Sequence, residues 1–169
     1  MLALARNEPG AAATVRTPLD LGALVRDALA DVHALATQRG STVEVVPGPP
    51  VTVQGDRVAL ALLVRNLADN ALRYSPPGAR VELRVLQEGS DALLVVDDTG
   101  PGIPAEERER VFDRFQRRAS GEETGSGLGL AIVRSIAERH GAEVTLGDSP
   151  LGGLRVTVRF APAVAGPRA

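Results

Sequence analysis

Apolar residues recur at helical spacing in three separate stretches of the chain. The first predicted helix covers residues 20–39, because Asp20 can cap its amino end and Gly40 can close its carboxyl end. The third covers residues 127–140. The second covers residues 56–74, and its core stripe consists of Leu60, Val64, Leu67 and Ala71. The opposite side of this second helix is polar.

Apolar and polar residues alternate in shorter stretches, which we predict to be β-strands. An edge strand is expected at residues 14–17, and a continuous apolar run at residues 93–96 predicts a buried central strand. Residues 41–46 and 51–53 flank a Pro-Gly-Pro-Pro turn and are predicted to form a hairpin. Further strands are expected at residues 81–85, 142–146 and 154–160. The pattern predicts an α/β fold, a two-layer α/β sandwich in which about three helices cover one face of a mixed, mostly antiparallel sheet.

Length and composition narrow this picture. The 169 residues have the size of one domain, and a hydrophobic content of 44% is enough to fill one core. The 19 basic and 21 acidic residues are intermixed, so nucleic acid is not an expected partner. The absence of cysteine excludes disulfides and thiolate metal ligands. No apolar stretch has the length that a bilayer span requires, which is typical of a cytoplasmic domain.

Two segments interrupt the pattern. Residues 1–6 resemble the last turn of a preceding helix, and we interpret residues 1–17 as the end of that helix and a linker. Residues 104–126 lie in a long stretch without an apolar face, and such a loop is usually functional or disordered. Residues 161–169 are predicted to be a disordered tail. The folded domain is therefore expected to span residues 18–160.

The polar side of the second helix carries Asn66, Asn70 and Arg73 in one row, because these residues are spaced i, i+4 and i+7. Asparagine is a mediocre helix former, so two amides and a cation opposite a core stripe indicate a surface that faces a ligand. A solvated helix face is the alternative. This segment taken alone does not decide between them.

A carboxylate lies where the predicted central strand ends. Asp98 can accept a hydrogen bond from an exocyclic amine such as that of adenine. Gly100 and Gly102, followed by Ile103, allow the backbone to approach a flat ligand closely. The alternative is an ordinary turn, since Asp-Thr-Gly-Pro-Gly is also common turn chemistry.

A glycine-rich stretch opens directly into the third predicted helix. Exposed backbone N–H groups and the positive end of a helix dipole make such a junction a candidate phosphate site. The stretch lacks the preceding strand of a dinucleotide fold and the lysine of a P-loop. Its residues are Gly125, Ser126, Gly127, Leu128, Gly129 and Leu130.

In this order, these elements resemble the N, G1, F and G2 boxes of bacterial histidine kinases, whose ATP-binding domains belong to a superfamily shared with DNA gyrase. Residues 66–75 resemble the N box and residues 98–102 the G1 box. Phe112 to Phe115 resembles the F box, and residues 125–129 resemble the G2 box. The resemblance covers roughly residues 18–160 and implies the Bergerat-type ATP-binding fold.

The resemblance also implies roles for single residues. Asn70 would supply an oxygen ligand to Mg²⁺ with Asn66 nearby, while Arg73 and Tyr74 would face the phosphates and the nucleoside. Asp98 would hold the adenine amine. Gly100 and Gly102 would admit the base, and backbone amides of the G2 box would approach the phosphates. ATP and Mg²⁺ are thus the implied cofactors.

The loop between the boxes would be a mobile ATP lid that is not ordered without nucleotide. Arg117 would reach the γ-phosphate from this lid, although a solvated arginine is the alternative. Phe112 and Phe115 are spaced i, i+3 in an otherwise polar loop, which indicates that they anchor one end of the lid. A local hydrophobic cluster is the competing interpretation for this pair.

One position separates the members of the superfamily. In the gyrase branch, the residue four before the metal-binding asparagine is a glutamate that activates water, whereas here it is Asn66. A neutral amide is no general base at neutral pH, and Asp69 points about 100° away from Asn70 around the helix. Transfer of the γ-phosphoryl group to a protein histidine is therefore expected instead of rapid hydrolysis.

The acceptor histidine is not expected within this chain. His33 and His140 both lack the sequence that surrounds acceptor histidines in the family, so the fragment should bind ATP without phosphorylating itself. The resemblance implies an absent dimerisation domain that carries the acceptor, a response regulator as partner, and an intact homodimer anchored in the bacterial inner membrane. The fragment itself would be a monomer. The alternatives are an anti-sigma-type serine kinase and a nucleotide-gated binding module without catalysis.

Overall fold

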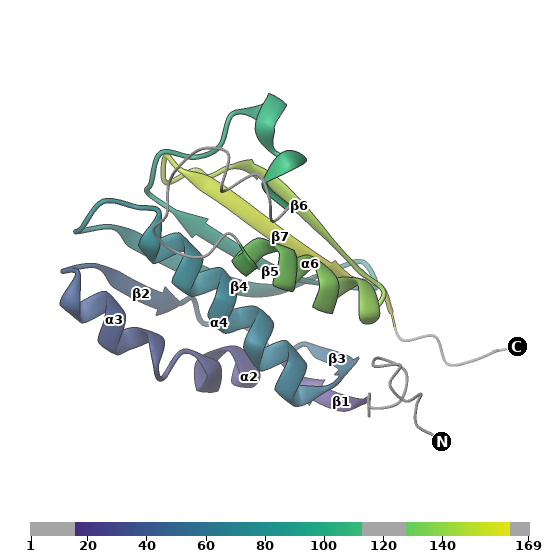
Figure 1. Cartoon of the computed structure of the whole chain (residues 1–169). Helices are drawn as coiled ribbons and strands as arrows, with labels where there is room; N and C mark the ends of the chain where they lie inside the picture. The colour runs from purple at the N-terminus through teal and green to yellow at the C-terminus, as the bar shows by residue number, and fades with distance from the viewer. Residues whose placement is uncertain (1–15, 113–127, 163–169) are drawn as a thin grey trace, which may run out of the picture.

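The computed structural model describes residues 16–112 and 128–162, and Figure 1 shows the chain with the helices and strands labelled. In chain order the elements are β1 (Thr17–Asp20), α2 (Leu21–Ala28), α3 (Val32–Gln38), β2 (Thr42–Val45), β3 (Thr52–Gly55), α4 (Arg57–Arg73), β4 (Arg80–Glu88), β5 (Asp91–Asp98), the 3₁₀ turns η1 (Ala105–Glu107) and η2 (Arg110–Phe112), α6 (Leu128–Arg139), β6 (Ala142–Asp148) and β7 (Leu154–Phe160).

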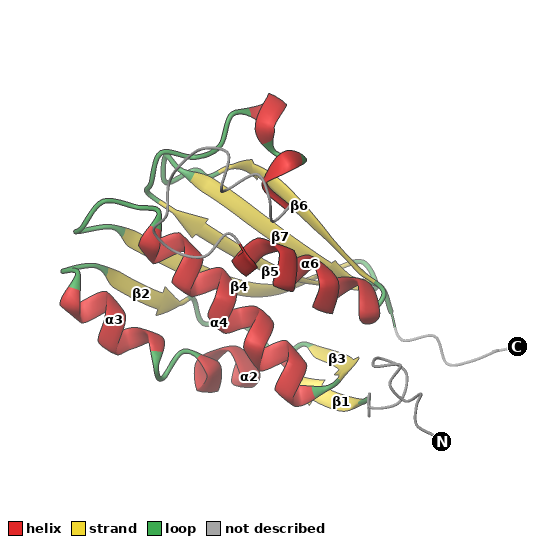
Figure 2. Ribbon diagram, viewed as in Figure 1, coloured by secondary structure: helices red, strands yellow, loops and turns green. Residues whose placement is uncertain are grey.

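Five strands form the main sheet in the order β2-β4-β5-β7-β6. Only β2 and β4 run parallel, and the other three pairs of neighbours are antiparallel. β1 and β3 form a separate two-stranded antiparallel sheet. Figure 2 shows the helices gathered on one face of the main sheet. The predicted two-layer α/β sandwich with a mixed, mostly antiparallel sheet is confirmed.

The core lies between β5 and the helices. Leu60, Val64, Leu67 and Ala71 are all at most 7% exposed, so the predicted stripe of α4 is the buried face. On β5 the alternate residues Ala92, Leu94 and Val96 pack into the same cluster. Burying a leucine or valine side chain contributes roughly 1.5–3 kcal/mol, so this interface fixes α4 on the sheet.

Capping residues define helix ends close to the positions that the sequence predicted. Asp20 Oδ1 accepts a hydrogen bond from Ala23 N at 3.1 Å, as the sequence predicted for the first helix. Asp56 Oδ1 accepts from Val58 N and Ala59 N at 3.0 and 3.3 Å, which defines where α4 begins. At the other end of the first helical region, Gly40 has a positive φ of 67° that closes α3.

The single helix predicted over residues 20–39 is wrong in one respect, because the chain divides it into α2 and α3. The final turn of α2 tightens, with Leu29 N and Ala30 N donating to the carbonyls three residues earlier at 3.3 Å. Leu29, Val32 and Ala36 are all buried and keep helical spacing through the break. The apolar pattern is therefore continuous although the helix is interrupted between α2 and α3.

The predicted hairpin of residues 41–46 and 51–53 is also wrong. β2 pairs with β4 in the main sheet, whereas β3 pairs with β1 in the small sheet. Val46 N still donates to Leu83 O at 2.8 Å, but the following Pro-Gly-Pro-Pro segment has only one amide hydrogen to offer a ladder. The prolines carry the chain from one sheet to the other.

No helix in the described ranges is long and apolar enough to cross a membrane. The predicted helix end at residues 1–6, half of the strand predicted at residues 14–17, and most of the predicted tail lie outside the described residues. The strand that is described begins at Thr17.

His140 connects the end of α6 to the beginning of α4. Its Nε2 accepts a hydrogen bond from Asp56 N at 3.0 Å, and its Nδ1 donates to Ile136 O at 2.9 Å. These two bonds require the neutral ring, because a protonated ring has no acceptor for the Asp56 amide. Burial lowers the pKa of His140, and Arg16 and Arg139 act in the same direction, against the Ile136 carbonyl and Asp56.

We expect this histidine to make folding sensitive to acid. Because its folded-state pKa is lowered, the unfolded chain takes up the proton first, so stability is full above about pH 6.5 and falls as the pH drops below it. Thermal unfolding of the native chain and of His140→Gln at several pH values measures this effect. The extra loss below pH 6.5 should disappear in His140→Gln but remain in His33→Gln, a change on the exposed side of α3. Parallel pH profiles for all three proteins would contradict the assignment.

Candidate functional site

The polar side of α4 presents the three residues that the sequence placed in one row. Asn66 and Asn70 are half-buried and Arg73 is exposed. Asn66 Nδ2 donates to Leu62 O at 2.9 Å, so the amide is oriented by its own helix. Arg73 Nε contacts both carboxylate oxygens of Asp69 at 3.0 and 3.1 Å. Both partners of this ion pair are exposed, so the pair stabilises the helix little but engages both side chains with each other.

The amino end of α6 packs against the asparagines of α4. A Cβ at Gly129 would lie 2.9 Å from Asn70 Oδ1 and 3.8 Å from Asn66 Oδ1. Only a glycine permits this approach, because real Cβ atoms essentially never come within 3.0 Å of another heavy atom. The first turn of α6 therefore meets the amide side chains of α4 directly, and the structure brings together two segments that the sequence analysis assigned to one site.

Asp98 lies at the end of β5, where it is 7% exposed. Its Oδ1 accepts hydrogen bonds from Gly100 N at 2.9 Å and from Leu154 N at 3.0 Å. Burial raises the pKa of Asp98, the two backbone hydrogen bonds oppose the rise, and the neighbouring Asp97 adds to it. Among the described residues no arginine forms an ion pair with Asp98. Its carboxylate therefore has no cationic partner there and can accept a further hydrogen bond besides the two from the backbone.

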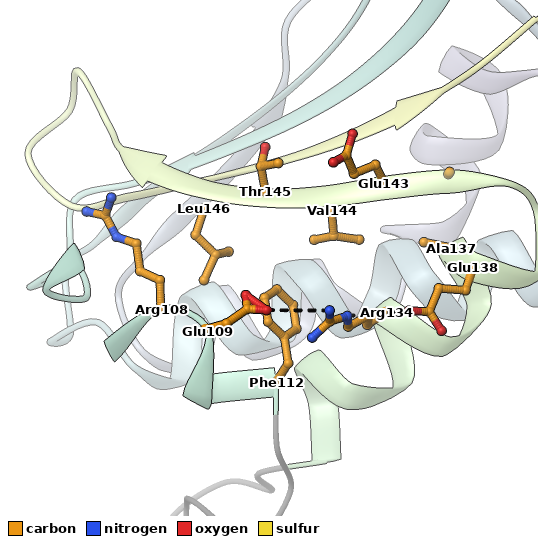
Figure 3. A pocket seen from close by; sticks show the side chains of 11 residues that line it. Arg108, Glu109, Phe112, Arg134, Ala137, Glu138, Glu143, Val144, Thr145 and Leu146 are labelled. Atoms are coloured by element: carbon orange, nitrogen blue, oxygen red, sulfur yellow. Dashed lines mark hydrogen bonds and ion pairs between the residues drawn. The ribbon is translucent and has the colours of Figure 1, made fainter. Parts of the chain in front are cut away.

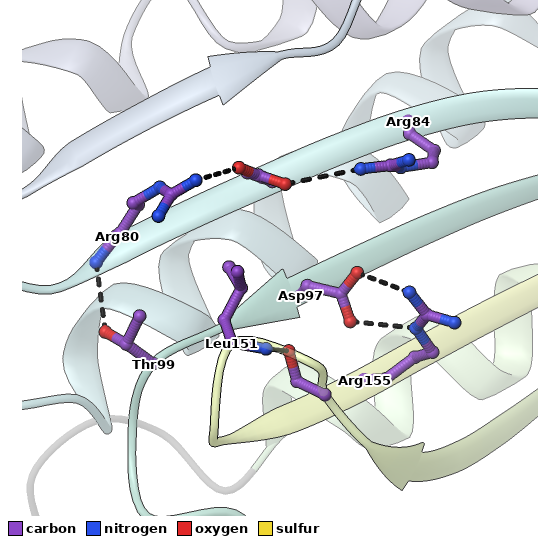
Figure 4. A network of polar contacts seen from close by, with 8 residues as sticks. Arg80, Arg84, Asp97, Thr99, Leu151 and Arg155 are labelled. Carbon is purple, nitrogen blue, oxygen red and sulfur yellow. Dashed lines mark hydrogen bonds and ion pairs between the residues drawn. The ribbon is translucent and has the colours of Figure 1, made fainter.

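Asp97 points to the opposite face of the sheet, as alternation along a strand requires. Arg155 Nε and Nη2 donate to its two oxygens at 2.8 Å each, and this pairing raises the pKa of the arginine (Figure 4). Arg80 N also donates to Thr99 Oγ1 at 3.1 Å, which ties the start of the following turn to β4. The two adjacent carboxylates thus have separate environments, and only Asp98 belongs to the helix-covered side.

The turn after Asp98 is packed tightly on both sides. A Cβ at Gly100 would lie 2.5 Å from Ser75 Oγ, and a Cβ at Gly102 would lie 3.4 Å from Gly153 O. Gly102 also has a positive φ of 76°, which an L side chain rarely adopts. Ile103 is half-buried, and its carbonyl accepts from Arg108 Nε at 2.9 Å. Packing therefore requires glycine at position 100, whereas the positive φ is what favours glycine at position 102.

The turn between β6 and β7 contributes to this site, and the sequence analysis missed it. Gly153 N donates to Asp98 O at 3.1 Å, and Leu154 N donates to the Asp98 side chain. Ser149 Oγ accepts from Leu151 N at 2.9 Å and shapes the turn. The only signal in the sequence is the Gly-Gly pair at positions 152 and 153, which is also typical of an ordinary turn.

The remaining predicted site residues are distributed as follows. Tyr74 caps the carboxyl end of α4 and is 37% exposed, and Leu130 is buried in the core. Leu128 is the first residue of α6. Phe115, Arg117, Gly125, Ser126 and Gly127 lie outside the described residues.

The described beginning of the predicted lid folds into η1 and η2. Phe112 is half-buried against the core, and the Arg134 guanidinium lies 4.8 Å from the centre of its ring. Phe112 lines a groove of about 420 Å³ together with Val144 and Leu146 of β6, and Figure 3 shows these side chains. No residue that lines this groove belongs to the Asn70 and Asp98 region. Phe112 therefore packs between Arg134 of α6 and the apolar residues of β6.

Comparison with known proteins assigns the class. Residues 55–164 match the family model of the histidine kinase-, DNA gyrase B- and HSP90-like ATPases. This range contains Asn66, Asn70, Asp98 and Gly129. The chain belongs to this family, as its motifs predicted.

Proteins similar to this chain include histidine kinases. The chain is 41% identical over 152 residues to the signal transduction histidine-protein kinase/phosphatase MprB of Mycobacterium tuberculosis, which is 89% of this chain but 29% of that protein. The solved structure of a mycobacterial sensor histidine kinase MprB has a TM-score of 0.75 and 35% identity, covering 88% of this chain and all of that one. The solved structure of the ATP-binding domain of PrrB from Mycobacterium tuberculosis has a TM-score of 0.72 and 32% identity. The match covers 88% of this chain and 98% of that one.

The packing of the β6–β7 turn under Asp98 can be tested by adding one methyl group. In Gly153→Ala the new carbon would overlap Asp98 Oδ1 and come within 2.5 Å of Gly100 N, so we expect a loss of about 1–3 kcal/mol in the free energy of unfolding. Gly147→Ala in β6 is the matched control, because no atom lies within 4 Å of the added carbon. Urea denaturation measures both variants. Equal midpoints would contradict the assigned packing.

Proposed function

We propose that this domain binds ATP together with Mg²⁺ and donates the γ-phosphoryl group to a histidine on a separate dimerisation domain. The observation that carries the proposal is the contact between Gly129 and Asn70, since it joins the glycine-rich helix start to the amide row of α4. The amino end of a helix favours phosphate through its free N–H groups and its dipole. An amide oxygen at the same place suits a cation that accompanies phosphate.

Asp98 is the group that would recognise the base. Gly100 N and Leu154 N both donate to Oδ1, which leaves Oδ2 uncommitted by these two bonds. A carboxylate oxygen accepts hydrogen bonds and donates none, so it matches the exocyclic amine of adenine and not the carbonyl oxygen of guanine. Burial without a cationic partner strengthens this discrimination, because an unmatched base would leave Oδ2 buried without a hydrogen-bond donor.

The side-chain oxygens of Asn66 and Asn70 at the contact between α4 and α6 suit a Mg²⁺ ion that is held mainly by a nucleotide. No group of three or more carboxylate, histidine or cysteine side chains in the described ranges could hold a metal alone. Mg²⁺ usually keeps several waters and takes one or two protein oxygens besides substrate phosphates. Asn70 Oδ1 would be such an oxygen, since it lies with Asn66 Oδ1 at the amino end of α6. The bound ion would supply neutralisation of the phosphate charge.

The residues around Asn70 favour transfer over hydrolysis. Asn66 is a neutral amide that donates to Leu62 O, so it offers no base for water. Asp69 is the nearest carboxylate in sequence, and it is paired with Arg73. Phosphoryl transfer needs positioning and charge neutralisation more than a protein nucleophile. An acceptor brought by another domain is consistent with these residues.

Neither histidine of the chain is a suitable acceptor. Both ring nitrogens of His140 are engaged by the backbone, and the residue is 9% exposed. His33 is exposed on α3, in the helical layer, with Nε2 at 3.3 Å from Val43 O. The acceptor is therefore expected outside these 169 residues. The chain spans 29% of the histidine-protein kinase/phosphatase MprB. The resemblance to histidine kinases implies that the intact protein would be a dimeric membrane-anchored sensor that passes phosphate to a response regulator.

Transfer in trans tests the proposed reaction. The chain is mixed with γ-labelled ATP, Mg²⁺ and a separately purified helical dimerisation domain that carries the acceptor histidine. Acid-labile label on that domain is expected, and the Asn70→Ala variant should reduce it by about 10-fold or more, since one amide ligand to the ion is lost. Acid-stable label would instead indicate a serine kinase. Absence of transfer with bound ATP would leave only a nucleotide-binding module.

Base recognition by Asp98 is tested with Asp98→Asn. The asparagine oxygen can keep both backbone hydrogen bonds, but its amide places a donor against the adenine amine. We expect ATP affinity to fall about 10- to 100-fold, with a smaller change for GTP. Calorimetric titration of both proteins with non-hydrolysable analogues measures this. The melting temperature should not fall, because the variant removes a buried charge. Unchanged preference for adenine would refute the assignment.

A further inference from the structure

Arg108 follows η1, and its guanidinium donates hydrogen bonds in two directions. Nε donates to Ile103 O at 2.9 Å, and Nη2 donates to Asp148 Oδ1 at 2.7 Å. Ile103 belongs to the turn that follows β5, whereas Asp148 is the last residue of β6. Figure 3 shows the Arg108 side chain extended toward this end of β6. One side chain therefore joins the turn after β5 to the turn after β6.

The same two turns meet again at Asp98. Gly100 N, in the turn after β5, and Leu154 N, where the turn after β6 ends, both donate to Asp98 Oδ1. A Cβ at Gly102 would lie 3.4 Å from Gly153 O, so the two backbones are also in close contact between these points. The two turns are thus joined at Asp98, at the glycine contact and, through the guanidinium, at their other ends.

The contacts of Arg108 act on local geometry more than on overall stability. The Asp148 side chain is 91% exposed and that of Arg108 is 23% exposed, and an ion pair with so exposed a carboxylate adds little to the free energy of unfolding. The geometry at Asp98 is more demanding, because a hydrogen bond weakens steeply when its donor is misaligned. A buried carboxylate without a cation depends on such bonds. A small separation of the two turns would therefore disturb Asp98 before it affects the rest of the fold.

We propose that Arg108 is a positioning residue of the nucleotide site, which holds the turn after β5 and the turn after β6 at the separation that brings both backbone amides to Asp98. This inference rests on the proposed ATP-binding function. Arg108 acts through the two turns, and no contact with the nucleotide is assigned to it. The residue lies outside the four sequence motifs of the site, so its role follows from its two hydrogen bonds alone.

Amide hydrogen exchange of the ligand-free chain tests this positioning without any nucleotide. Arg108→Met keeps an aliphatic stem in place and removes both hydrogen bonds. The amides of Gly100 and Leu154 should exchange about 3- to 10-fold faster, as expected when local opening loses the restraint of one hydrogen bond. The amides between β4 and β5 should keep their native rates. Native rates at Gly100 and Leu154 would overturn the inference and leave the proposed function standing.

Two further variants make the comparison specific. Arg134→Met is the matched control, because Arg134 lines the same groove as Arg108 but pairs with Glu109 and Glu138. It should leave the exchange of the two amides unchanged, and an equal acceleration in this control would overturn the inference. Asp148→Ala removes only the exposed carboxylate and should shift the same two amides in the same direction, which keeps the test valid if Arg108→Met does not fold.

Calorimetric titration then tests whether this positioning matters for binding. Arg108→Met should bind ATP and ADP more weakly by the same factor of about 3 to 10, because the altered turns lie on the base side and not at the γ-phosphate. Arg134→Met should bind both nucleotides as the native chain does. Unchanged affinity in a variant whose two amides exchange faster, or a loss confined to ATP, would overturn the inference alone. A native chain that binds no nucleotide would refute the inference and the proposed function together.

Discussion

The site depends on how one buried carboxylate is held. Asp98 ends the central strand β5, and its Oδ1 accepts from backbone amides on two sides, one in the following turn and one at the start of β7. A buried carboxylate without a cation is unfavourable unless hydrogen bonds satisfy it. These two amides therefore fix the ends of three segments at one point. The same interaction that stabilises the charge also determines where the turn at Gly100 lies.

Close backbone approach is the second constraint, and it follows from the first. Gly100 contacts Ser75, Gly153 contacts Asp98, and Gly129 contacts Asn70 at distances that exclude a Cβ. Gly100 follows β5 and meets the segment after α4. Gly153 precedes β7 and meets the end of β5, and Gly129 lies in α6 and meets α4. The glycines thus act as spacers of minimal size between parts of the site, and their flexibility is a secondary property.

The sequence predicted the regular elements well where periodicity and caps agree. α4, with Asp56 as its cap and a continuous core stripe, is found within a residue of its predicted limits. Periodicity failed at Leu29, because a tight turn kept the buried positions in phase. The predicted hairpin was wrong because strand pairing depends on tertiary contacts that the local sequence does not contain. β2 pairs in parallel with β4, which follows it in the chain only after β3 and the whole of α4.

For the site, the motifs named Asn70, Asp98 and Gly129, and the structure brings Gly129 to Asn70. Motifs could not name the donors that hold Asp98 from the other side. Leu154 donates through its backbone amide, and almost any side chain at this position would allow the same hydrogen bond, so the sequence carries no signal for it.

The two helices of the site are aligned by a contact at their far ends. α4 and α6 run antiparallel, because Gly129 at the start of α6 meets Asn70 near the end of α4, while His140 beyond α6 meets Asp56 before α4. A helix behaves as a nearly rigid rod over such lengths, so fixing one end sets the register at the other. The hydrogen bond from Asp56 to the neutral ring of His140 therefore helps to set the spacing between amide and glycine at the site. Protonation of this buried ring would remove the hydrogen bond from Asp56 and with it one of the contacts that align Asn70 with Gly129.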